Sequence, residues 1–183
     1  EPAGFDYYSV FHDQGTYRDP VFKTAENWMD DDKGVGGAVE KGFSTDLVTD
    51  KAIRWIKERD RTKPFSMFCH FKATHEPCDF PERFAHLYDG VKFPEPENLL
   101  EFGPAKSGRT FAGQPLETMA WRWNKAYTDP ENWWTYYPEL PFCGVEGDSV
   151  ANRRAIYQKL VRDYLRCAAA IDDNIGRLLA CLL

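Results

Sequence analysis

The stretch FSMFCHFKATHEP, residues 65–77, changes from an apolar run into polar side chains that can take part in chemistry. Apolar residues occupy both alternating positions of residues 65–71, a pattern typical of a strand buried on both faces of a sheet. Lys72, His75 and Pro77 follow directly. Because ligands of open α/β sheets bind beyond the carboxyl ends of the strands, Lys72 and His75 are candidates for binding an anion.

Residues 44–61 precede this predicted strand and show the periodicity of a helix. Ser44, Thr45 or Asp46 can cap it, and Pro64 separates its polar end from the strand. Its apolar face consists of Leu47, Ala52, Ile53 and Ile56. A helix, a short loop and a buried strand make half of a β-α-β unit. We therefore predict an α/β sandwich with a partial, mainly parallel sheet flanked by helices.

Residues 150–183 carry the strongest helical pattern and contain no Pro. The apolar positions recur at steps of three and four residues: Ile156, Leu160, Tyr164, Cys167, Ile171, Ile175, Leu178 and Leu182. Asp172 and Asp173 interrupt this pattern. Adjacent helical side chains point in different directions, so we interpret the two carboxylates as an exposed or locally hydrogen-bonded pair and not as a catalytic dyad.

The remaining segments give weaker patterns. Residues 5–11 predict a short aromatic strand, and residues 81–88 predict one short helix. Residues 89–149, the aromatic-rich segment, contain many Pro and Trp residues and no regular period. Long irregular segments inside a domain usually act as lids or insertions, so we predict a long irregular insertion here.

Two segments could suggest a bound cation, and each has a simpler interpretation. His12 and Asp13 lack a third partner at ligand spacing, which favours hydrogen bonding within a loop. Residues 30–37 lack the alternating carboxylates and distal Glu of a calcium-binding loop, which favours a solvated acidic turn. The five Cys residues show no zinc spacing, and we predict that Cys69 and Cys167 are small core residues.

Length and charge limit the classes of function. The chain has 183 residues, enough for one domain, and a formal net charge of −6. Such a charge argues against nucleic acid or an anionic membrane as partner, so positive charge for an anionic substrate must be local. No segment approaches the ~20 apolar residues of a membrane span. Neither end resembles a natural terminus, and we expect an internal piece of a longer protein.

Four segments occur in an order that has a precedent in a known family. They are TDLVTDKAI at 45–53, KPF at 63–65, HFKATHEP at 70–77 and YLRCAAAIDDNIGRLL at 164–179. Together they resemble the sulfatases of the alkaline-phosphatase-like superfamily. The resemblance implies an alkaline-phosphatase-like sandwich, in which residues 1–183 are the central portion of a single catalytic domain.

The resemblance also implies roles for two residues. In that family a Lys and a His on such a segment bind the sulfate ester, and the His assists at the leaving oxygen. By position these catalytic and substrate-binding roles fall on Lys72 and His75. Thr74 stands where many relatives have Pro, a difference that we expect to be tolerated, and we interpret His70 as a structural neighbour. The implied activity is hydrolysis of sulfate esters on a small molecule or glycan.

Sulfatases use a formylglycine nucleophile made from a C/S-x-P-x-R motif, and they bind calcium. No such motif occurs in this sequence. The resemblance places both the nucleophile and the calcium ligands outside this chain, so we assign it no metal ligand and expect the 183-residue piece alone to be inactive. A periplasmic, secreted or lysosomal location is implied as well, whereas the oligomeric state stays open.

Two other functions remain open at this point. A phosphodiesterase or phosphonate hydrolase of the same superfamily would share the fold, but usually offers more metal-binding His and Asp than this chain, which has only four His. A non-catalytic carbohydrate-binding module could use the Trp side chains of the aromatic-rich segment. The predicted helix–strand order differs from the many short strands of a lectin sandwich.

Overall fold

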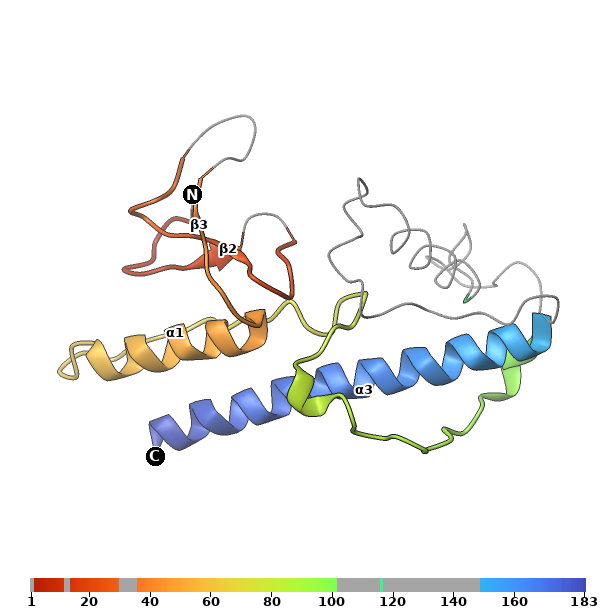
Figure 1. Cartoon of the computed structure of the whole chain (residues 1–183). Coiled ribbons are helices and arrows are strands. Elements are labelled where there is room, and N and C mark those ends of the chain that lie inside the picture. The colour runs from red at the N-terminus through yellow and green to blue at the C-terminus, as the bar shows by residue number, and fades with distance from the viewer. Residues whose placement is uncertain (1, 12–13, 30–35, 102–115, 117–148) are drawn as a thin grey trace. The chain divides into compact units, whose positions relative to one another are not determined.

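The structure is a computed structural model that describes residues 2–11, 14–29, 36–101, 116 and 149–183 (Figure 1). The chain divides into two compact units. The first comprises Glu1–His75 and Ala168–Leu183, and the second comprises Glu76–Cys167. The predictions for His12, Asp13, residues 30–35 and nearly all of the aromatic-rich segment beyond residue 101 lie outside the described residues.

The first unit contains a small sheet. Its strands are β1 (Val10–Phe11), β2 (Val21–Lys23) and β3 (Ala38–Val39), in the order β1-β2-β3. Both pairings are antiparallel, with Phe22 opposite Phe11 on one side and Ala38 on the other. The prediction of a mainly parallel sheet is therefore wrong for the described residues. Short connections allow neighbouring strands to pair antiparallel, whereas parallel pairing needs a long crossover.

Residues 65–71 do not form the predicted strand. Their backbone makes no ladder hydrogen bond within the described part of the chain, and Phe68 is 70% exposed. The Phe65 ring instead packs against Trp55, with ring centres 5.5 Å apart. The apolar pattern of a strand creates a strand only when another backbone lies beside it to complete the hydrogen bonds. No described segment supplies that neighbour.

Helix α1 (Ser44–Glu58) confirms the predicted helix and begins at Ser44 as predicted, but its capping residue differs from the prediction. The N-cap is Phe43, and no side chain caps the helix. Ser44 and Thr45 lie buried in the first turn instead of acting as caps. The buried face continues through Thr49, Ala52 and Ile56, at helical spacing.

Helix α3 (Ser149–Leu182) confirms the second predicted helix and contributes to both units. Its buried stripe is rotated by about one residue from the predicted apolar face. Asp163, Ala170 and Asn174 are at most 1% exposed, whereas the expected core residues Tyr164 and Ile175 are more than 40% exposed. Hydrogen bonds from Asn174 to Asp46 and from Arg166 to Asp89 orient the helix, and an apolar pattern does not reveal such bonds. Ile156 and Cys167 are buried as predicted.

In the second unit, α3 holds a segment that has little regular structure of its own. Residues 81–101 contain two 3-10 turns, Glu82–Phe84 and Glu97–Leu100, so the helix predicted at 81–88 is reduced to a single turn. Five side chains of α3 bind the backbone of this segment. They are Arg153 to Leu99 and Glu101, Tyr157 to Pro94, Gln158 to Phe93, Arg162 to Tyr88 and Val91, and Arg166 to Leu87.

These contacts satisfy carbonyl groups that a strand or helix would otherwise satisfy, and they attach the segment along several turns of α3. Arg166 also forms ion pairs with Asp163 and Asp89, at 3.4 and 2.6 Å. Its guanidinium lies 5.1 Å from the centre of the Phe80 ring. Among the helices of the described residues, none combines the length and the apolar character needed to cross a bilayer.

Candidate functional site

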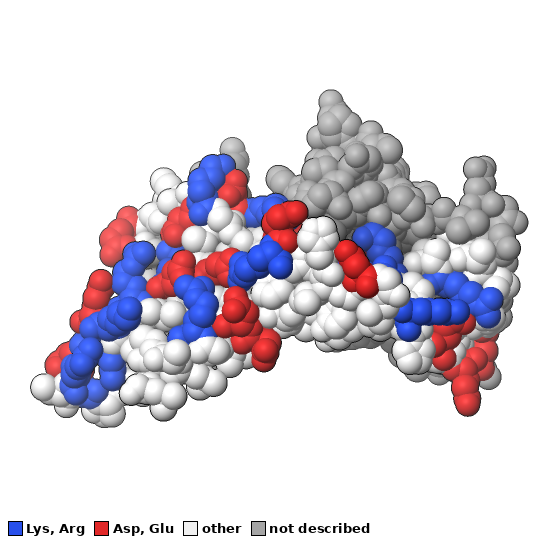
Figure 2. All heavy atoms as spheres, turned by 60° about the horizontal axis from the view of Figure 1, so that its bottom comes forward, with Lys and Arg blue, Asp and Glu red and all other residues white. Residues whose placement is uncertain are grey.

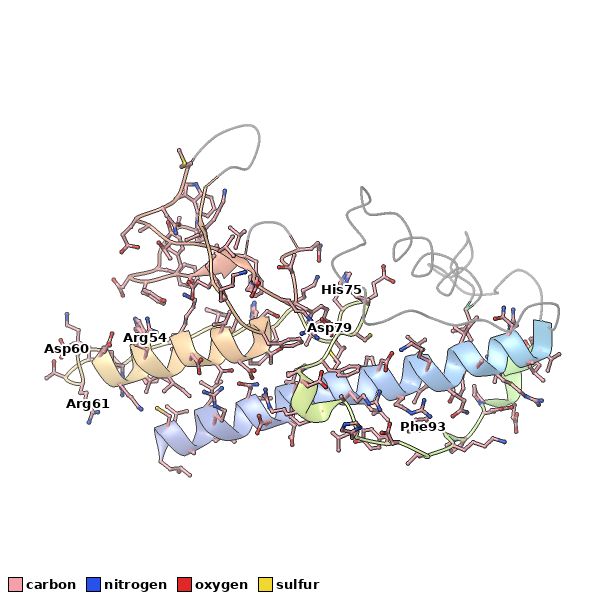
Figure 3. The ribbon with its side chains drawn as sticks, in the orientation of Figure 1. Arg54, Asp60, Arg61, His75, Asp79 and Phe93 are labelled. Carbon is pink, nitrogen blue, oxygen red and sulfur yellow. The ribbon has the colours of Figure 1, made fainter. Side chains whose placement is uncertain are left out.

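The two predicted site residues lie at the ends of one tight turn in the first unit. The His75 backbone N–H donates a hydrogen bond to the Lys72 carbonyl, at 3.0 Å. The turn therefore brings the backbones of these two residues close together in space and reverses the direction of the chain. His75 is exposed and Lys72 is half-buried. Figure 3 shows His75 at the end of this turn, beyond the N-terminal end of α1.

Two contacts direct the Lys72 side chain. Its ammonium group donates a hydrogen bond to the Gln14 carbonyl, at 3.2 Å. The same nitrogen lies 5.3 Å from the centre of the Tyr17 ring, within the range of a cation–π interaction. Neither of these two contacts involves a carboxylate.

Tyr17 connects both predicted residues. It is 0% exposed, and its hydroxyl donates a short hydrogen bond to the His75 carbonyl. The ring packs against Phe43 with centres 5.8 Å apart. Sequence analysis missed this residue because it lies in the polar stretch between β1 and β2. A large aromatic residue in such a stretch was the available signal that something there is buried.

The backbone around Tyr17 is attached to the start of α1. The Ser44 N–H donates to the Tyr17 carbonyl at 2.7 Å, and the Asp19 N–H donates to the Gly42 carbonyl at 2.9 Å. The Asp19 carboxylate accepts bonds from the Lys41 ammonium and the Gly42 N–H, which lower the pKa of Asp19. This carboxylate therefore stays ionised at neutral pH and its bonds persist.

The local chemistry suits an anionic ligand. A lysine ammonium and an imidazole on one turn can both contact the oxygens of an oxyanion, and a His side chain can transfer a proton at neutral pH. On the face drawn in Figure 2, basic and acidic side chains are interspersed over the described residues. The overall charge is −6, so attraction of an anion depends on individual side chains such as Lys72.

Other candidate residues take no part in this arrangement. The exposed His70 contacts the Phe68 ring, with ring centres 6.0 Å apart. Asp172 and Asp173 are exposed on α3, as predicted. The described residues contain no group of three or more His, Cys, Asp or Glu side chains that could hold a metal ion. The sequence also contains no C/S-x-P-x-R motif.

Comparison with protein families assigns the class. The family model described as Sulfatase matches residues 3–183. This chain therefore belongs to the sulfatase family, and the resemblance found in the sequence is confirmed.

Two known proteins are similar to the chain. N-acetylglucosamine-6-O-sulfatase of Bacteroides thetaiotaomicron is 34% identical to this chain over an alignment 209 residues long. The match covers 98% of this chain and 36% of that protein. The solved structure of BT4656 in complex with its substrate, D-glucosamine-2-N,6-O-disulfate, has a TM-score of 0.65 and 30% identity. That match covers 100% of this chain and 41% of the solved chain. The chain thus spans well under half the length of either relative.

Proposed function

We propose that this chain is part of an enzyme that hydrolyses sulfate esters, and that its substrate is a glucosamine sulfated at the 6-O position. Membership of the sulfatase family supports the reaction class. The substrate class is supported by two relatives, one named as an N-acetylglucosamine-6-O-sulfatase and one solved with a glucosamine disulfate.

The observation that carries the proposal is the turn with Lys72 and His75 at its two ends, joined by a hydrogen bond of 3.0 Å. Cleavage of a sulfate ester moves negative charge onto the bridging oxygen as the ester bond breaks. A fixed ammonium near that oxygen stabilises the charge. An imidazole there can donate a proton to the leaving oxygen. We assign the first role to Lys72 and the second to His75.

The nucleophile and the metal are assigned to other parts of the full-length protein. A formylglycine would supply the attacking oxygen and calcium would bind the sulfate, but the residues described here fit neither group. No step is therefore assigned to them. The same family match favours a sulfatase over a phosphodiesterase and over a purely carbohydrate-binding module.

Substitution in the full-length enzyme tests the proposal. Lys72→Ala and His75→Ala should each lower kcat on 6-O-sulfated N-acetylglucosamine by on the order of a hundredfold or more, because each removes a group that stabilises the transition state. Sulfate release by ion chromatography measures the rate.

Matched controls are Lys63→Ala and His86→Ala, since both residues are exposed and lie outside the turn. They should retain the wild-type rate. Wild-type kcat in both Lys72→Ala and His75→Ala would refute the assigned roles. Faster hydrolysis of a phosphodiester than of the sulfated sugar would refute the reaction class.

A further inference from the structure

Tyr17 makes two different contacts with the turn that carries the predicted site. Its hydroxyl binds the His75 carbonyl, and the face of its ring lies 5.3 Å from the Lys72 ammonium. One side chain therefore touches both ends of the turn. The two contacts use separate parts of the Tyr side chain, so they can be removed separately.

The position of Tyr17 is determined by its own surroundings. Its carbonyl accepts a bond from the Ser44 N–H, and its ring packs against Phe43, the N-cap of α1. Arg18, the next residue, forms an antiparallel bridge with Phe43. Tyr17 is 0% exposed. A side chain enclosed in this way has few rotamers available and can act as a rigid support.

We propose that Tyr17 is a positioning residue that aligns Lys72 and His75 on the sulfate group of the substrate. The inference rests on the proposed function. A lysine side chain is long and flexible, and a ring beneath the ammonium restricts where that charge can lie. The bond to the His75 carbonyl fixes the backbone that carries the imidazole. Small displacements of catalytic groups cost large factors in rate.

Two substitutions in the full-length enzyme separate the contacts. Tyr17→Phe keeps the ring and removes the hydroxyl, so it should lower kcat by about fivefold, the effect of one ordinary hydrogen bond. Tyr17→Leu removes both contacts and should lower kcat by about thirtyfold. KM should change by less than about twofold, because misalignment affects the transition state more than substrate binding.

A double-substitution cycle distinguishes positioning from general stability. If Tyr17 acts through Lys72, Tyr17→Leu should lower kcat much less in a Lys72→Ala background than in the wild type. Equal effects of Tyr17→Leu in the wild type and in both the Lys72→Ala and the His75→Ala backgrounds would overturn the inference. The matched control is Phe22→Leu, another buried aromatic residue of this unit at 1% exposure. It should lower the melting temperature and leave kcat unchanged.

The outcomes separate this inference from the proposed function. Wild-type kcat in both Tyr17 variants, with activity lost in Lys72→Ala, overturns the positioning role and retains the sulfatase assignment of Lys72. Wild-type kcat in both Lys72→Ala and His75→Ala overturns the assigned roles and the positioning role together. If Tyr17→Leu fails to fold, Tyr17→Phe still decides the matter, because it preserves the ring and its packing.

Discussion

At the scale of single residues, burial determines which side chains remain chemically available. Cys78 is 4% exposed, and burial raises the pKa of its thiol to about 12. Cys167 is 0% exposed. Only thiolates react readily, so a buried thiol with a raised pKa is inert at neutral pH. His75 has the opposite environment, because it is exposed at the end of its turn.

Thiol labelling tests the effect of burial on Cys78. In the native full-length protein at pH 8, iodoacetamide should label Cys78 at least tenfold more slowly than the half-buried Cys181, as measured by peptide mass spectrometry. The pKa of Cys78 is raised, so its thiolate fraction and labelling rate should rise as the pH increases towards 12. Denatured protein is the control, in which both residues should react alike. Native labelling of Cys78 at the denatured rate would contradict the burial.

At the scale of elements, the motif on α1 and the motif on α3 are joined by hydrogen bonds between their side chains. On α1, Asp46 and Asp50 are four residues apart, and on α3, Asn174 and Arg177 are three apart. Asn174 donates to the Asp46 carboxylate at 2.8 Å, and Arg177 donates to Asp50. Asn174 is 0% exposed and also binds the Ala170 carbonyl and Arg177. These motif residues hold the two helices together through hydrogen bonds between their side chains.

Removing Asn174 should therefore destabilise the protein. We expect Asn174→Ala to lower the free energy of unfolding by about 1–3 kcal/mol, because it leaves buried hydrogen-bonding groups unsatisfied. Denaturant unfolding measures the change. The exposed Asp172→Ala is the matched control on the same helix and should stay within about 0.5 kcal/mol of the wild type.

The combined Asp46→Ala and Asn174→Ala variant then tests the contact itself. Because the two side chains are bonded, their effects should deviate from additivity by roughly 0.5–3 kcal/mol. Strict additivity would show that the bond between α1 and α3 contributes nothing to stability.

At the scale of the whole molecule, the first unit contains an incompletely covered apolar region. A cavity of about 570 Å³ is lined by aromatic side chains of the N-terminal segment, by α1 and by residues 66–70. Phe5 and Phe68 beside it are 52% and 70% exposed. The chain spans 36% of its curated relative. We expect other parts of a full-length sulfatase to cover this region and to pair with residues 65–71, because large exposed apolar patches mark contact surfaces.

Hydrogen exchange tests this expectation. In the isolated 183-residue chain, backbone amides of residues 65–71 should exchange rapidly, because they make no ladder bond within the described residues. In the full-length protein the same amides should be protected by at least tenfold. Amides in the middle of α1 serve as the internal control and should be protected in both. Rapid exchange of residues 65–71 in the full-length protein would show that no strand pairs with them.

The local sequence was sufficient for the two helices and for the location of the candidate site. An α-helix completes its backbone hydrogen bonds within itself, so periodicity and Pro positions predicted α1 and α3 nearly to their ends. Lys72 and His75 could be identified because they stand together in one short motif. Their roles still await the kinetic test.

Only the tertiary structure determined those features that depend on contacts between residues far apart in the sequence. A strand needs a neighbouring backbone, so residues 65–71 could not become one on the strength of their apolar pattern alone. The buried face of α3 is set by bonds from Asn174 to Asp46 and from Arg166 to Asp89, which lie far away along the chain and which no local period reveals. Tyr17 is 58 residues before His75, and only folding brings its hydroxyl and ring to the turn. Contacts of that kind depend on the path of the whole chain, because hydrogen bonds and packing act at short range in space and not in sequence.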